Sequence, residues 1–449
     1  MKLGASFRFI TKTVYHAFLG IPQLNEHHDS TIYALDRFER YTIFFCTLRN
    51  GFRQYEVQPR QVSQSTFLRR FFGARNWSIR LASALNFFRF LSLIFIEEES
   101  TRIYLGDNVF RSKDRNSICV LILSSIVVSI FSREWFLHIE AGHKCTVLNN
   151  YDWIRNKGLF DNVYLKMTVN QAKQFRITVH FLLNLYNRII VVLVPFITIL
   201  YNLPFLTNPY TYRIPLLAFY GSLWSLTLTW SVVFLANEIF TISGYLFFIC
   251  AVHYHRIESI IEQCNSKPNS IYSTRREYSS IYLDKSIISW ASLCTSTWTD
   301  RINQFEFDFD RLRYLVLYYF TVVAFLGDLF IFLGLVVGAH SKLVANMIAM
   351  LGGLILVLCV IACYFTGGFV TKLQLCHRKF HSICCSTKLP ILNSLKILEI
   401  MDRSLGPRVG IKVGDLTTIT QMFFISFILE VGSTLMLFVC NVRGLFASN

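Results

Sequence analysis

The chain has 449 residues, of which 53% are hydrophobic, 16% are aromatic and only 16% are charged, and its formal net charge is +16. Soluble domains carry about 25% charged residues, so this composition excludes an ordinary soluble protein and indicates helices in lipid. The basic residues lie between apolar segments, as orientation signals do, and no basic-aromatic module is present, which argues against nucleic acid as a partner.

The apolar segments predict an all-α membrane protein with seven transmembrane helices, which follow a polar, basic N-terminal region at 1–79. About 20 apolar residues suffice for a helix to cross the hydrocarbon core. The predicted spans cover 80–97, 117–138, 177–201, 214–236 with an extension to 254, 313–338, 345–371 and 416–440. The chain is therefore expected to comprise a cytosolic region at 1–79 and one membrane domain at 80–449.

The fourth apolar segment, 214–254, is too long for one crossing. As a helix it would measure about 60 Å, twice the thickness of the hydrocarbon core. It is either one span that continues into the cytosol or two spans. With seven spans and a cytosolic N-terminus, the inner segments hold 32 of the 44 Lys and Arg residues and the outer segments hold 7. Two crossings would abolish this bias, so the charges favour seven spans, with an extracellular C-terminus.

This layout separates several classes of membrane protein. A G-protein-coupled receptor also has seven spans, but its N-terminus is extracellular. Here Asp36-Arg37-Phe38 lies in the N-terminal tail and Asn208-Pro209-Tyr210 lies in a short outer loop, not at the positions such receptors use. A secondary transporter would be expected to show internal repeats, and none is visible. A metabotropic seven-helix receptor and a small-molecule carrier remain alternatives to the interpretation that follows.

The seven spans, the cytosolic N-terminus, the short outer loops and the larger inner loops resemble the insect gustatory and odorant receptor superfamily. That family carries Thr-Tyr, five mostly apolar residues and Gln-Phe in its last helix. This chain has Thr434-Leu435, MLFVC at 436–440, and Asn441-Val442. The Thr and an amide stand at the matching spacing, whereas Leu and Val replace the two aromatic residues. The pattern resembles a divergent member of the family.

The resemblance implies a ligand-gated, non-selective cation channel of the gustatory type, in the plasma membrane of sensory neurons. In that family four subunits, identical or mixed, form a tetramer, and the seventh helix of each lines the pore. The inner ends of helices four to seven pack into a cytosolic anchor, which would account for the overlong segment 214–254. A small organic tastant would bind in the outer half of the other helices. No cofactor, metal or enzymatic activity is expected.

The last span carries a polar stripe. At about 100° per residue, Phe423, Glu430, Thr434, Leu437 and Asn441 fall within a band about 60° wide. Polar groups on a membrane helix must face protein or water. In a pore, Leu437 would form the apolar constriction, Asn441 the outer mouth, and Glu430 would attract cations. The alternative is hydrogen bonding between helices of one subunit.

Arg188 lies in the middle of the third span, with Asn184 one turn before it. A charge at this depth costs about 2.5–3.5 kcal/mol, so a partner is expected, and Asp328 and Glu238 are the candidates. The group is either a structural ion pair or part of a ligand pocket.

Tyr220 and Trp224 are spaced i, i+4 in the outer half of the fourth span, where their rings could stack on an organic ligand. Core packing or contact with lipid is the alternative.

One inner segment combines thiols and imidazoles: Cys376, His377, His381, Cys384 and Cys385. Their spacing matches no tetrahedral zinc pattern, and reduced cytosolic thiols are the simpler interpretation. The sequence FEFDFD at 305–310 alternates acidic and aromatic residues and suggests no defined role.

Overall fold

The computed structural model describes residues 27–45, 74–141, 165–265, 280–337, 341–386, 390–405 and 409–447, which are almost entirely helical. The elements in chain order are α2 (His27–Phe44), α4 (Ala74–Phe95), α5 (Glu99–Tyr104), α6 (Arg115–Ala141), α9 (Val169–Thr207), α10 (Pro209–Arg213), α11 (Pro215–Asn265), α12 (Ser280–Tyr318), η4 (Tyr319–Val323), α13 (Ala324–Phe332), η5 (Leu333–Val337), α14 (Lys342–Ser386), α15 (Ile391–Leu405), β1 (Lys412–Val413), β2 (Thr417–Thr418) and α16 (Gln421–Ala447).

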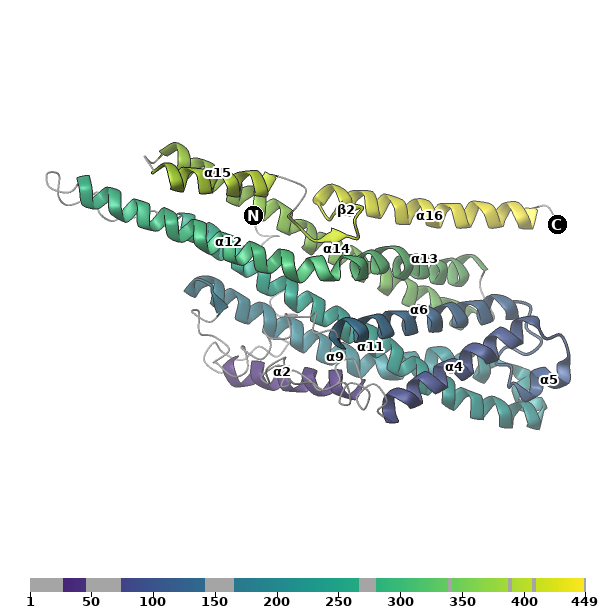
Figure 1. Ribbon diagram of the computed structural model, residues 1–449. Coiled ribbons are helices and arrows are strands. Elements are labelled where there is room, and N and C mark those ends of the chain that lie inside the picture. The colour runs from purple at the N-terminus through teal and green to yellow at the C-terminus, as the bar shows by residue number, and fades with distance from the viewer. Residues whose placement is uncertain are drawn as a thin grey trace, which may run out of the picture.

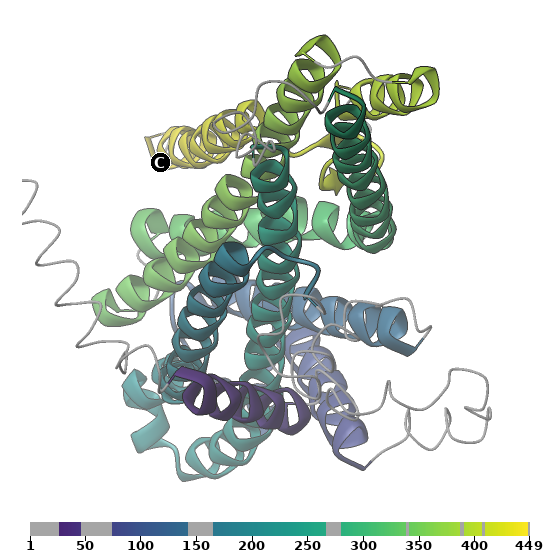
Figure 2. The same ribbon diagram turned by 90° about the vertical axis from the view of Figure 1, so that its left-hand side faces the viewer.

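The long helices lie side by side in an elongated bundle, with α5 at one end and α15 at the other (Figure 1). Helix α11 packs against α4, α6, α9, α12 and α14, and so forms the centre of the bundle. It is apolar around most of its circumference, as a helix buried on all sides must be. Helices α15 and α16 lie at the periphery of the bundle in the view along it (Figure 2).

Within the described residues, six helices are long and apolar enough to cross a membrane: Asn76–Phe95, Arg115–His138, Val169–Thr207, Pro215–Asn265, Leu312–Leu335 and Lys342–Cys385. The apolar part of α16 whose side chains are described, Gln421–Met436, is shorter. The protein is therefore a multi-pass helical membrane protein, as predicted. The seventh crossing and the orientation in the membrane stay predictions.

The structure has a single helix over the segment that could have crossed twice. Helix α11 runs for 51 residues without interruption, which corresponds to about 76 Å. A continuous helix cannot turn back, and about 30 Å of it fills the hydrocarbon core. The remainder extends toward the α15 end of the bundle, where α12 and α14 also extend and pack with α15.

Two irregularities interrupt the helical pattern. The helix that begins with α12 contains two π-helical turns, η4 and η5, on either side of α13. Before α16, the strands β1 and β2 form a short antiparallel pair in which Lys412 faces Thr418, a small departure from the predicted all-α architecture.

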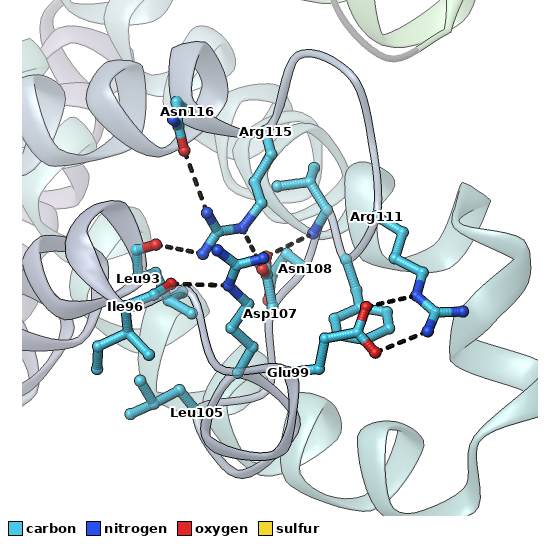
Figure 3. Close-up of polar contacts among 12 residues, drawn as sticks. Leu93, Ile96, Glu99, Leu105, Asp107, Asn108, Arg111, Arg115 and Asn116 are labelled. Carbon is cyan, nitrogen blue, oxygen red and sulfur yellow. Dashed lines mark hydrogen bonds and ion pairs between the residues drawn. The ribbon is translucent and has the colours of Figure 1, made fainter.

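The connection between α4 and α6 is folded tightly against the α5 end of the bundle. Arg89, which is only 2% exposed, donates to the carbonyl of Leu105 at 2.8 Å and to Oδ1 of Asn108 at 2.7 Å. Arg115 reaches back to Asp107 at 2.5 Å and to the carbonyl of Leu93 (Figure 3). Each buried guanidinium is thus hydrogen-bonded, which permits an arginine in the first apolar span.

This connection meets α11 at a backbone contact that only glycine permits. Gly106 has φ of +59°, and a Cβ there would lie 2.8 Å from the Cα of Gly221. We expect Gly106→Ala to lower the free energy of unfolding by about 1–3 kcal/mol, because the left-handed backbone and the contact both disfavour a side chain. Thermal denaturation in detergent measures the change. Gly432→Ala is the control, because a Cβ at Gly432 meets no atom within 4 Å. Equal melting temperatures for the two variants would contradict this account.

Candidate functional site

A cavity of about 240 Å³ lies inside the bundle, between α6, α9, α11, α12, η4, α13 and α14. The side chains around it are almost all apolar, and they include Leu193, Leu235, Phe240, Phe330, Leu358 and Ala362. An engineered cavity of about 150 Å³ lined by such side chains stays dry and binds benzene. The present cavity therefore has room for a somewhat larger apolar molecule.

Most hydroxyl groups around the cavity bond to the protein, whereas Tyr319 Oη is buried without a hydrogen-bond partner among the described residues. Ser125 donates to the carbonyl of Ile122 at 2.8 Å and accepts from Tyr201 Oη at 3.0 Å. Ser243 and Thr366 each donate to a carbonyl of their own helix at 2.7 Å. No Asp, Glu, Lys or Arg is among the described residues that line the cavity. The site thus suits an uncharged molecule and disfavours an ionised one, which would lose its hydration without gaining a partner.

One wall of the cavity also supports α16. Phe320, in the π-helical turn η4, lines the cavity, and its ring packs edge-on against Phe423 at 6.0 Å and Phe427 at 5.4 Å between centroids. Cys359 of α14 lines the cavity too, and it belongs to the same apolar cluster as Phe427. A single layer of side chains therefore separates a bound molecule from the last helix.

A buried polar pair lies next to one of the lining residues. Phe309 lines the cavity, and next to it His253 Nε2 lies 3.0 Å from Asp308 Oδ2. The rings of Phe305 and Phe309 both pack on His253. Sequence reasoning had given the FEFDFD segment no role. The i, i+4 spacing of its two outer Phe residues on a helix was the signal that could have placed them on one buried face.

The predicted polar stripe lies at the edge of the exposed face of α16. Glu430 is exposed and Thr434 is half-buried, whereas Phe423, predicted to share their stripe, packs inward on Phe320. The fully exposed face is centred instead on Met422, Leu429 and Met436. The predicted constriction Leu437 and the predicted mouth Asn441 belong to α16, and their side chains lie outside the described residues.

None of the five predicted ligand-binding residues lines the cavity. Tyr220 packs against Tyr104 of α5 with 5.3 Å between ring centroids, and Trp224 Nε1 donates to the carbonyl of Tyr104 at 3.3 Å. Both residues hold the connection that caps the α5 end, and this is the packing alternative recognised from the sequence.

Of the other three predicted ligand residues, Asn184 and Arg188 lie one turn apart on α9, and Asp328 lies on α13. Asn184 Nδ2 donates to the carbonyl of His180 in its own helix at 3.0 Å. Arg188 is exposed on α9, and Asp328 is buried in α13. The structure does not bring Arg188 to Asp328 or Glu238 within the described residues.

Glu238 pairs instead with Arg133 of α6. Arg133 Nε lies 2.8 Å from Glu238 Oε2, and both side chains are almost fully buried. Arg133 also donates to Oδ1 of Asn76 at 2.6 Å, and next to it Arg80 binds Glu134 through two hydrogen bonds. This cluster ties α4, α6 and α11 together. Arg133 was visible in the sequence near the end of the second span, but the spacing along the chain gave no way to select its partner.

The thiols and imidazoles near the end of α14 do not converge. Cys376 is buried, and His377 Nδ1 lies 3.2 Å from the carbonyl of Met401 in α15. Across the part of the chain that the structure describes, no group of three or more His, Cys, Asp or Glu side chains is arranged to hold a metal ion.

Comparison with known proteins gives a result in structure only. No family model and no curated protein matches the sequence. Among solved structures, the insect olfactory receptor OR5 from Machilis hrabei, in complex with eugenol, aligns with a TM-score of 0.58. The alignment covers 92% of this chain and 99% of that chain at 12% sequence identity. This chain has the fold of an insect olfactory receptor. The resemblance predicted from the layout and the last helix is thereby confirmed at the level of the fold.

Proposed function

We propose that this chain is a subunit of a chemosensory receptor of the gustatory type, which conducts cations when a small molecule occupies the cavity. The observation that carries the proposal is the position of Phe320, between the cavity and α16. A molecule that changes the packing of this ring also changes the surface on which Phe423 and Phe427 of α16 pack. Packed cores respond to such changes by switching between discrete arrangements.

The polar side chains of α16 support its role as the pore helix. Between 421 and 442 the helix carries one charged residue, Glu430, and this residue is exposed. An ionised side chain facing lipid near the bilayer centre costs at least about 2.5–3.5 kcal/mol. A water-filled conduit between several copies of α16 removes this cost and gives the carboxylate a function, the attraction of cations.

The exposed face of α15 supports assembly into an oligomer. Four apolar side chains of this helix are more than half exposed: Ile391, Leu392, Leu395 and Leu398. The helix follows the polar end of α14, beyond the apolar stretch that would lie in the bilayer. An apolar patch in water marks an interaction site. We propose that copies of the chain, or a related chain, cover it in a tetramer in the plasma membrane of sensory neurons.

The cavity supports a particular class of ligand. Its largely apolar lining, in which Tyr319 Oη is a buried hydroxyl without a partner among the described residues, suits an uncharged, largely apolar tastant rather than a sugar or an amino acid. A current evoked by such a compound in liposomes that contain only this protein would separate the channel from a metabotropic receptor. Uptake of the compound without current would point to a carrier and contradict the proposal.

The pore assignment is tested at Leu437. We expect Leu437→Ser to raise the resting cation current severalfold, because a hydroxyl wets an apolar constriction that otherwise closes by dewetting. Whole-cell recording with measured surface expression checks this result. Val431→Ser is the control, because Val431 packs on the cluster around Phe427 within the subunit. An unchanged resting current in well-expressed Leu437→Ser would contradict the pore assignment.

A further inference from the structure

Asp328 is an acidic residue buried at membrane depth. It lies on α13, between the π-helical turns η4 and η5, and it is only 3% exposed. Its Oδ1 is buried and has no hydrogen-bond partner. Among the described residues it forms no ion pair. An ionisable side chain in such a place is costly and points to a function.

The face of α13 that carries Asp328 packs against α14 and α16. Ala324, one turn before Asp328, belongs to the apolar cluster of Phe427, and Ile331, three residues after it, packs on that cluster. The contact with α14 is close, since a Cβ at Gly352 would lie 2.6 Å from the carbonyl oxygen of Gly327. Asp328 is thus enclosed between helices and is covered on one side by the proposed pore helix.

Among the residues whose side chains the structure describes, no cation faces Asp328 from the elements packed around it. Helix α14 has no charged residue between Lys342 and Lys372, and α6 has none from 116 to 132. The titratable group of α14 that interacts with Asp328 is the Cys359 thiol. Among the described side chains of α16, the charged one is the exposed acid Glu430, and Arg443 follows thirteen residues later, beyond the described side chains. An ionised carboxylate in these surroundings would lose its hydration without compensation, so the neutral acid is the form that fits.

We propose that Asp328 holds a proton in the state seen here and releases it when α13 or α16 moves and admits water, so that protons regulate the channel. The inference rests on the proposed function for its effect on current. The π-helical turns on both sides of α13 are places where a helix can shift its register, and they often mark functional segments. Because the proton is bound in one state and lost in the other, acid favours the state seen here and alkali favours the exposed state.

Protonation of Asp328 can be tested by a measurement that does not depend on channel current. The melting temperature of the purified, intact protein in lipid nanodiscs is measured from pH 5 to 8 for the wild type, Asp328→Asn and Glu430→Gln. The folded protein binds a proton that the unfolded chain has released in this range, so wild-type stability falls as the pH rises. We expect Asp328→Asn to remove on the order of 1–3 °C per pH unit of this fall, and Glu430→Gln to retain it.

Two outcomes would overturn the proposal. One is a pH slope in Asp328→Asn equal to that of the wild type. The other is failure of this variant to fold, because an uncharged isostere should be accepted where the native group is already uncharged. If the pH slopes of the melting temperature differ as expected but no ligand evokes current in any variant, protonation of Asp328 is supported and the proposed channel function is contradicted.

The regulation is tested by current. Wild-type ligand-evoked current should fall severalfold between pH 8 and pH 5.5, applied in turn to each side of a bilayer. Asp328→Asn should give a small current that alkali does not restore, because the neutral side chain mimics the protonated acid. A full pH response in Asp328→Asn would show that another group senses the protons and would overturn the assignment.

Discussion

Replacing Glu238 with alanine is expected to lower the free energy of unfolding by about 3–5 kcal/mol, among the largest effects of any single substitution in this protein. Arg133 is 1% exposed, and its Nε lies 2.8 Å from the Glu238 carboxylate. Removal of the acid leaves a guanidinium buried among α4, α6 and α11 with Asn76 and Glu134 as its remaining partners among the described residues. Thermal and denaturant unfolding of the purified protein in detergent measures the loss.

Two further variants separate the ion pair from a general loss of packing. The double variant Arg133→Met with Glu238→Leu should recover most of the lost stability, because two apolar side chains of similar volume leave no charge behind. Arg111→Ala removes the exposed ion pair between Arg111 and Glu99, 2.7 Å apart, and should change the melting temperature very little. The hydrogen bonds that Arg111 donates lower the pKa of the Glu99 carboxyl group. Equal losses in Glu238→Ala and Arg111→Ala would contradict the importance of burial.

Filling the cavity is expected to abolish the response to ligand while the protein remains folded. Ala362 of α14 lines the cavity, and Ala362→Phe would place a ring in a space of about 240 Å³. The ring and a bound molecule would compete for the same volume. We expect the half-maximal concentration of an active, uncharged aromatic compound to rise by at least about 100-fold, which corresponds to about 2.7 kcal/mol.

The measurement is a dose–response curve for current, with the melting temperature as a check of folding. Val357→Phe is the matched control, because Val357 lies on the same helix, is 53% exposed and does not line the cavity. An unchanged response in Ala362→Phe would place the ligand elsewhere, for example near Tyr220 and Trp224 at the α5 end.

Some features of the candidate site were within reach of the sequence and others were not. The helix that carries Glu430 and Thr434 could be found, because a polar stripe on an apolar helix is a periodic signal. The face of this helix that points inward could not be predicted, because periodicity gives the angles between residues of one helix and not the direction of neighbouring helices. Phe423 shows the consequence, because it shares the angle of the polar stripe and yet packs on Phe320.

The partners of buried charges show the same limit. Arg89 lies within the first predicted span, and the structure supplies the carbonyl of Leu105 and Oδ1 of Asn108 as its hydrogen-bond acceptors. Glu238, one of the two acids suggested as partners of Arg188, pairs with Arg133 instead. Pairing depends on where helices touch, and residues far apart in the chain, such as Arg133 and Glu238, carry no mark of their contact in spacing or composition.

By itself, the sequence determined that this is a helical membrane protein, where its apolar segments lie, and that 214–254 is too long for an ordinary span. These properties follow from the length of apolar runs, because every backbone group in lipid must be satisfied within its own helix. The tertiary structure decided the location of the cavity, the contact of Phe320 with α16 and the isolation of Asp328. Each of these arises from packing between helices, where shape and close contact select neighbours that local sequence does not encode.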